Sequence, residues 1–150
     1  MKANIIAAGE GKPQNFFGTI LDWKATAETT DGALSLVEAH GFKGAEPPIH
    51  YHENADEFFY VVSGDMTFMV GTEIKRVGSG GFVWIPRMVA HGFAIHSVDA
   101  KFLFGFVPAG LERMFREIGT GPLDPDAHRQ QYGTIVVGPR LAKSQAFKSL

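Results

Sequence analysis

Four side chains near the middle of the chain have the types and spacing that could hold a metal ion. His50 and His52 are separated by one residue, so in an extended segment they point to the same face, about 7 Å apart along the strand. Glu57 begins the next apolar run, and His91 follows a later one. Three neutral imidazoles and one carboxylate suit a divalent first-row transition metal ion. The pattern predicts one such ion and leaves Fe, Mn, Ni, Cu, Co and Zn open.

The other histidines and the acidic residues near this set are interpreted as ordinary side chains. A single histidine is usually a hydrogen-bonded residue, and a charged loop residue is usually hydrated. We therefore expect no metal at His40, His96 and His128, and we expect solvated carboxylates at Glu46, Glu53 and Asp56.

Short apolar runs separated by turn residues predict the strands that must position the four side chains. Turn residues recur about every 8–12 residues, which is the spacing of an all-β sandwich or barrel. Thirteen phenylalanines and 18 glycines fit many short strands joined by tight turns. The predicted strands are residues 23–28, 34–40, 57–62, 66–70, 74–77, 82–85, 92–95 and 101–107.

The last third of the chain has a different pattern. Residues 111–118 have helical apolar spacing, and Gly119 follows where a C-cap glycine is expected. Asp124 and Pro125 predict a second short helix that ends at residue 131. We expect residues 134–137 to form a strand or an extended arm and residues 140–150 to form a loose tail. We expect one domain over residues 1–150, with a barrel at about 19–107 and a helical segment and tail at about 110–150.

The strand at residues 101–107 is apolar on both faces. Phe102, Phe104 and Phe106 share one face, and Leu103 and Val107 lie on the other. A strand with two apolar faces is covered on both sides. We therefore expect the barrel interior on one side, a subunit interface on the other, and a homodimer.

Composition excludes several classes of protein. The chain has 150 residues, a formal net charge of −2 and no cysteine, so it forms no disulfide and has no thiol nucleophile. The longest uncharged run, residues 88–98, is shorter than the roughly 20 residues of a membrane helix. Basic residues are scattered, which disfavours nucleic acid as a partner. With no signal-peptide pattern at the first residues, we expect a cytoplasmic protein.

Two segments of the chain resemble the motifs of the cupin superfamily. Residues 44–64 match the first motif, G-x5-H-x-H-x4-E-x6-G, at every fixed position. Residues 80–91 match the second motif, G-x5-P-x-G-x2-H, except that Met88 replaces its glycine. Ile95 stands where an asparagine is often found. We expect Met88 to alter its turn and Ile95 to make the interior drier. The resemblance covers about residues 19–119, loosely also 132–138, and residues 104–119 look like those that follow the barrel in quercetin-dioxygenase-like cupins.

This resemblance implies a fold, a site and an activity. The fold is a double-stranded β-helix, or jelly roll, and the metal ion lies inside it, held by His50, His52, Glu57 and His91. The implied activity is that of a metal-dependent dioxygenase acting on a small aromatic or enolic substrate, with Glu57 also accepting a proton from a substrate hydroxyl. Strand parity and apolar character predict the pocket walls as Phe59, Phe93, Ile95 and Phe104.

Two other functions stay open at this stage. The first is a redox-neutral isomerase or lyase that uses its ion only as a Lewis acid. The second is a cupin that binds a small molecule without catalysis. One fold hosts many chemistries, so the motifs alone do not choose among them.

Overall fold

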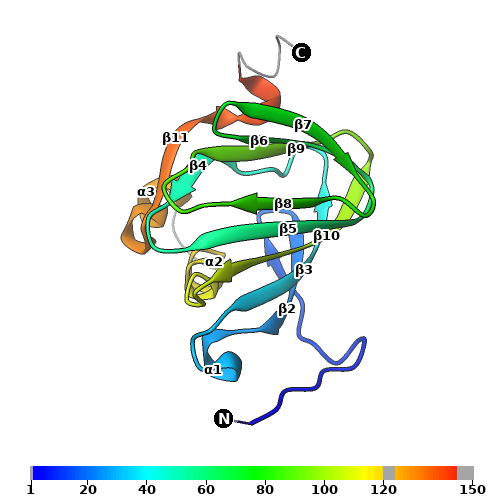
Figure 1. Ribbon diagram of the computed structural model, residues 1–150, viewed down its shortest axis with the longest axis vertical. Coiled ribbons are helices and arrows are strands. Elements are labelled where there is room, and N and C mark those ends of the chain that lie inside the picture. Colours follow the sequence, from blue (N-terminus) through cyan, green and yellow to red (C-terminus); the bar gives the residue numbers. More distant parts are fainter. Residues whose placement is uncertain (1, 120–123, 145–150) are drawn as a thin grey trace.

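Two antiparallel sheets face each other in the computed structural model, which describes residues 2–119 and 124–144 (Figure 1). Within these ranges, one sheet has the order β1-β2-β3-β10-β5-β8 and the other the order β11-β4-β9-β6-β7. This is the jelly roll that the sequence predicts. The first sheet comprises β1 (Gln14–Phe16), β2 (Thr19–Ala25), β3 (Ser35–Phe42), β10 (Asp99–Val107), β5 (Asp56–Ser63) and β8 (Phe82–Ile85). The second comprises β11 (Thr134–Arg140), β4 (Pro48–His52), β9 (His91–Ile95), β6 (Asp65–Val70) and β7 (Glu73–Gly78).

Alternation along β5 and β10 decides which side chains enter the core between the sheets. Successive residues of a strand point to opposite faces. The inward residues of both strands are nearly inaccessible to solvent. They are Glu57, Phe59 and Val61 on β5 and Phe102, Phe104 and Phe106 on β10. Phe59 and Phe104 are paired across the two strands, and their ring centroids lie 5.6 Å apart. Each such ring contributes roughly 1.5–3 kcal/mol to folding by burial.

Short helices cover one end of the barrel. They are α1 (Ala27–Thr30), α2 (Glu112–Ile118) and α3 (Pro125–Arg129), followed by 3-10 turns at Gln130–Tyr132 and Leu141–Lys143. The fully buried carboxylate of Glu112 accepts hydrogen bonds from the backbone N–H groups of Ala27 (2.5 Å) and Gly110 (2.7 Å), which ties α2 to α1. Figure 1 shows α3 beside β11. Among the described residues, no helix is long and apolar enough to cross a membrane.

Local predictions differ from the structure in detail. The strand predicted at 23–28 runs from Thr19 to Ala25, because Thr26 caps α1 and ends the extended segment. Gly119 is the C-cap residue of α2 as expected, although its φ of −59° is right-handed. The predicted tail begins as a folded turn, since Leu141 is fully buried beside Ile49 and Met69. The rest of that tail, residues 145–150, lies outside the described residues. No pattern in the sequence predicted the strand β1.

Gly64, the last glycine of the first motif, is required by the turn between β5 and β6. Its φ is +105°, a backbone conformation that L side chains rarely adopt. A Cβ atom there would lie 2.7 Å from the Cβ of Ala100 on β10. Glycine therefore allows the turn to pack against β10.

The outer face of β5 and β8 is apolar and exposed. Phe58 is paired with Trp84, and their rings are stacked at a centroid distance of 6.4 Å. Tyr60 is paired with Phe82, and Phe82 has 61% of its surface exposed. Large apolar surfaces of this kind often mark interfaces. The homodimer remains a prediction, and this face is where we expect the two copies to meet.

Substituting a charged residue for an apolar one on this face tests the predicted homodimer. We expect Phe82→Glu to convert a dimer into a monomer, because the carboxylate would be buried without a partner in the interface. Size-exclusion chromatography with light scattering measures the change. Val98→Glu is the control, since Val98 is 84% exposed in the turn between β9 and β10. A wild-type protein that is already monomeric would contradict the prediction.

Candidate metal centre

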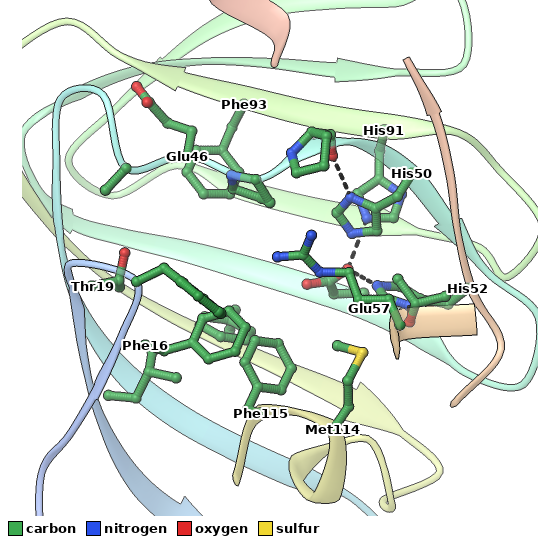
Figure 2. Close-up of a pocket in the computed structure, with 18 of the residues that line it drawn as sticks. Phe16, Thr19, Glu46, His50, His52, Glu57, His91, Phe93, Met114 and Phe115 are labelled. Carbon is green, nitrogen blue, oxygen red and sulfur yellow. Dashed lines mark hydrogen bonds and ion pairs between the residues drawn. The ribbon is translucent and has the colours of Figure 1, made fainter. Parts of the chain in front are cut away.

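The two sheets bring the four predicted ligands together inside the barrel. β4 carries His50 and His52, and β9 carries His91 directly opposite His50. Glu57 comes from β5 in the facing sheet. One donor atom from each side chain lies within 4.8 Å of all the others. None of the four side chains is more than 9% exposed, and Figure 2 shows them gathered on one side of the pocket.

Hydrogen bonds on the outer side of the imidazoles leave lone pairs for a metal. The Nδ1–H of His50 donates to the carbonyl of Pro48 (2.7 Å), and that of His91 donates to the carbonyl of Val89 (2.9 Å). A carbonyl can only accept, so in the neutral rings the lone pair is on Nε2. Nδ1 of His52 lies 2.9 Å from the hydroxyl of Thr134 on β11. Such outer partners fix the orientation of metal-binding histidines.

The charges in this cluster favour an ionised Glu57. Its Oε2 lies 3.0 Å from Nε2 of His52 and 2.9 Å from Nε2 of His91. Burial by itself raises the pKa of Glu57, but the two imidazoles outweigh it and hold this pKa well below its usual range. Burial, and then the neighbouring His91, lowers the pKa of His50 to about 3. Burial opposes protonation of His91 as well, but its hydrogen bond to Glu57 raises its pKa above the ordinary value.

This donor set fits one divalent transition metal ion. Two rings present an Nε2 lone pair, His52 can present a third, and Glu57 supplies one negative charge to compensate the ion. Four protein ligands leave one or two positions open on a five- or six-coordinate ion, and an open position distinguishes catalytic from structural sites. The identity of the ion stays open, because several ions share this ligand preference.

A cavity of about 150 Å³ adjoins the four donors. Three of the predicted pocket residues line it: Phe59, Phe93 and Phe104. The fourth, Ile95, lies outside its lining and is buried beside Gly41 and Phe102. Parity assigned Ile95 to the inner face, but its place along β9 carries it beyond the cavity. In Figure 2, Phe16, Met114 and Phe115 line the pocket below the four donor groups.

Sequence reasoning missed the cavity residues that come from segments outside the predicted barrel range of about 19–107. Phe16 on β1, Met114 and Phe115 on α2, Arg129 on α3 and Thr134 on β11 all line the cavity. The signals for them were the resemblance of residues 104–119, which include Met114 and Phe115, and the loose resemblance of residues 132–138, which include Thr134. Their own segments give no local pattern that points to the metal site.

Glu46 was expected to be solvated and is instead buried, with 7% of its surface exposed. Its carboxylate accepts hydrogen bonds from the backbone N–H groups of Gly44 and Ile95, both at 2.9 Å. The charge is thus compensated by the backbone, and it anchors the loop before β4 to β9. Asp56 is half-buried and pairs with Arg87, while Glu53 is exposed as expected.

Met88 replaces the glycine of the second cupin motif, yet the loop that contains it remains hydrogen-bonded to β4 and β5, the strands that carry three of the four donors. Met88 adopts a φ of +68°, the left-handed conformation that favours glycine. Its N–H donates to the carbonyl of His52 (2.7 Å), and the N–H of Arg87 donates to Asp56 (2.8 Å). Met88 thus takes the positive φ itself, and the two motifs remain hydrogen-bonded.

Comparison with known proteins agrees with this fold and site. A family model described as a cupin domain matches residues 42–106. The quercetin 2,3-dioxygenase of Bacillus subtilis is 31% identical over 111 residues, which is 70% of this chain. This chain spans about a third of that enzyme's length. Residues 42–106 therefore carry a cupin domain, and the chain resembles quercetin-dioxygenase-like cupins.

Solved structures support the same fold. KdgF from Halomonas sp. matches with a TM-score of 0.66 and 23% identity over 75% of this chain and 99% of its own. Pac13 of Streptomyces, described as a nucleoside dehydratase, matches with a TM-score of 0.57 and 17% identity over 75% of this chain and 88% of its own. At these identities the likeness concerns the fold alone.

Removing one ligand tests the metal site. We expect His52→Ala to lose its bound ion, because the three remaining donors leave an incomplete set. Metal content is measured by inductively coupled plasma mass spectrometry on protein purified without a histidine tag. His40→Ala, at a partly exposed histidine that pairs with Asp99, should keep the ion. Equal metal content in the two variants would contradict the assignment.

Acid should weaken metal binding. The histidine ligands must be neutral to bind, and Glu57 raises the pKa of His91 in the metal-free protein. Protons therefore compete with the ion as the pH falls from about 7 to about 5. We expect occupancy, measured by equilibrium dialysis against Ni(II), to fall across this range. Occupancy that stays constant down to about pH 5 would count against these ligands.

Proposed function

We propose that this chain is a metal-dependent dioxygenase acting on a small aromatic or enolic compound. The observation that carries the proposal is the convergence of His50, His52, Glu57 and His91 beside an apolar cavity. A redox-active divalent ion at these side chains would bring O2 and an electron-rich substrate together. The similarity to the Bacillus quercetin 2,3-dioxygenase supports this reaction class.

Glu57 has a second role in this proposal. Its Oε2 faces the imidazoles of His52 and His91, whereas its Oε1 makes no hydrogen bond to any residue that the structure describes. Oε1 can therefore accept the proton of a substrate hydroxyl. Loss of that proton makes a phenol or enol electron-rich, which is what reaction with O2 requires.

The walls of the cavity orient the substrate and exclude water. Phe59, Phe93 and Phe104 form an aromatic surface next to the four donors. Apolar walls with a few placed polar groups are typical of small-molecule sites. A flat, apolar substrate packs against these rings while its polar end lies toward Glu57.

Oxygen consumption distinguishes this function from its alternatives. We expect protein loaded separately with Fe(II), Mn(II), Ni(II), Co(II) or Cu(II) to consume O2 in the presence of a catechol, a flavonol or a 1,3-diketone. With ¹⁸O2, mass spectrometry should find both labelled atoms in the product. We expect Glu57→Gln to reduce turnover per bound ion by about 100-fold or more. Glu53→Gln is the matched control, because Glu53 is an exposed carboxylate four residues away.

The other outcomes identify the competing functions. Turnover without O2 consumption by the Zn(II)-loaded protein would overturn the dioxygenase and indicate an isomerase or lyase. Tight ligand binding without turnover by any of these metal forms would indicate a binding protein. Unchanged activity in Glu57→Gln would remove Glu57 from the mechanism.

A further inference from the structure

Arg129 is a charged residue buried in the wall of the metal cavity. Only 8% of its surface is exposed, and it lines the same cavity as the four donors. It ends α3, five residues before Thr134, whose hydroxyl contacts His52. Arg129 is therefore only a short stretch of chain away from a residue that contacts one of the four donors.

Among the described residues, Arg129 makes few hydrogen bonds for a guanidinium. A guanidinium has five N–H donors in a planar fork. Within the described ranges, its one hydrogen bond goes from Nη1 to Asp126 on the same helix. The Asp126 side chain is half-exposed, so solvent weakens its compensation of the buried charge. The remaining donors are available to an acceptor that enters the cavity.

The charges around the cavity favour an anion. Burial lowers the pKa of Arg129 below its ordinary value while Asp126 opposes this, and an arginine stays protonated in either case. Glu57 would neutralise only one of the two positive charges of a divalent ion. The carboxylate of Glu46 accepts hydrogen bonds from the backbone N–H groups of Gly44 and Ile95 and is directed to them. With Arg129 and its partner Asp126 both counted, the metal-loaded site keeps one excess positive charge, which one carboxylate would balance.

The volume of the cavity suits a ligand with one aromatic ring next to the four donors. Its volume is about 150 Å³, and an apolar cavity of that volume in another protein binds benzene. A single ring with small substituents fits such a space next to the four donors.

We propose that the ligand of this site is a small organic acid of about one aromatic ring, whose carboxylate is bound by the guanidinium of Arg129. The planar fork matches a carboxylate in a two-hydrogen-bond geometry. The ring then packs on the phenylalanines, with its other end at the metal ligands. This inference rests on the metal site of the proposed function and names its substrate class.

A matched pair of ligands tests the inference without turnover. The probes are 3,4-dihydroxybenzoate and 3,4-dihydroxybenzamide, which have the same shape but differ in charge. Binding to the Zn(II)-loaded protein is measured by calorimetry and by the fluorescence of Trp23, which contacts the cavity rings Phe104 and Phe115. We expect wild type to bind the acid about tenfold or more tightly than the amide, as a charge-assisted hydrogen bond requires.

Variants assign the preference to Arg129. In Arg129→Gln the ratio of the two affinities should fall close to one, with metal content unchanged. Arg129→Lys should keep a reduced preference, because it retains the charge without the fork. Arg113→Gln is the control and should leave the ratio unchanged, since Arg113 is an exposed arginine on α2.

Each outcome decides the inference. A wild-type protein that binds the amide as tightly as the acid overturns it without any variant, so misfolding of Arg129→Gln leaves the test intact. An unchanged ratio in a folded Arg129→Gln also overturns it. Preference for the acid without O2 consumption would sustain this inference while the dioxygenase fails. Consumption of O2 with neutral substrates only would support the dioxygenase and overturn the binding of a carboxylate by Arg129.

Discussion

The structure depends on placing one ionised carboxylate between two sheets. A buried charge costs several kcal/mol unless it is paired and hydrogen-bonded. Glu57 is buried among aromatic rings of β5 and β10, and its described partners are His52 and His91 of the facing sheet. The register of β4 with β9 must therefore be held in place. A one-residue slip of β4 would turn His52 to the other face, and a slip of β9 would do the same to His91, so either slip would remove one of the two partners of Glu57.

The sequence predicted the ligand set because strand periodicity is local. His50 and His52 differ by two positions, so any extended backbone places them on one face. The same parity relates Phe59 to Glu57 and Phe93 to His91, and both phenylalanines line the cavity. Parity does not give distance along the barrel axis, which is why it could not separate Phe93 from Ile95. The resemblance to the cupin motifs supplied the convergence of the strands, which periodicity alone does not supply.

Residue type alone gave a wrong prediction at Glu46, where backbone N–H groups compensate a buried charge. Glu46 is acidic and lies in a loop, so hydration was the natural expectation. Its actual partners are two backbone N–H groups, one of them 49 residues away on β9. Arg129 was missed for a related reason. Its short helix has no apolar periodicity that fixes a buried face, and only the fold brings α3 against β11.

The residues of the site divide into two groups with different origins. All four metal donors lie within residues 42–106, the range that the cupin domain matches. Phe16, Met114, Phe115 and Arg129 line the cavity from outside that range. Similarity to cupins in the matched range therefore covers the four candidate metal ligands. Under the proposed function, the choice of ligand would depend on the flanking segments as well, because the aromatic rings of β1 and α2 and the charge of α3 complete the cavity walls that Phe59, Phe93 and Phe104 begin.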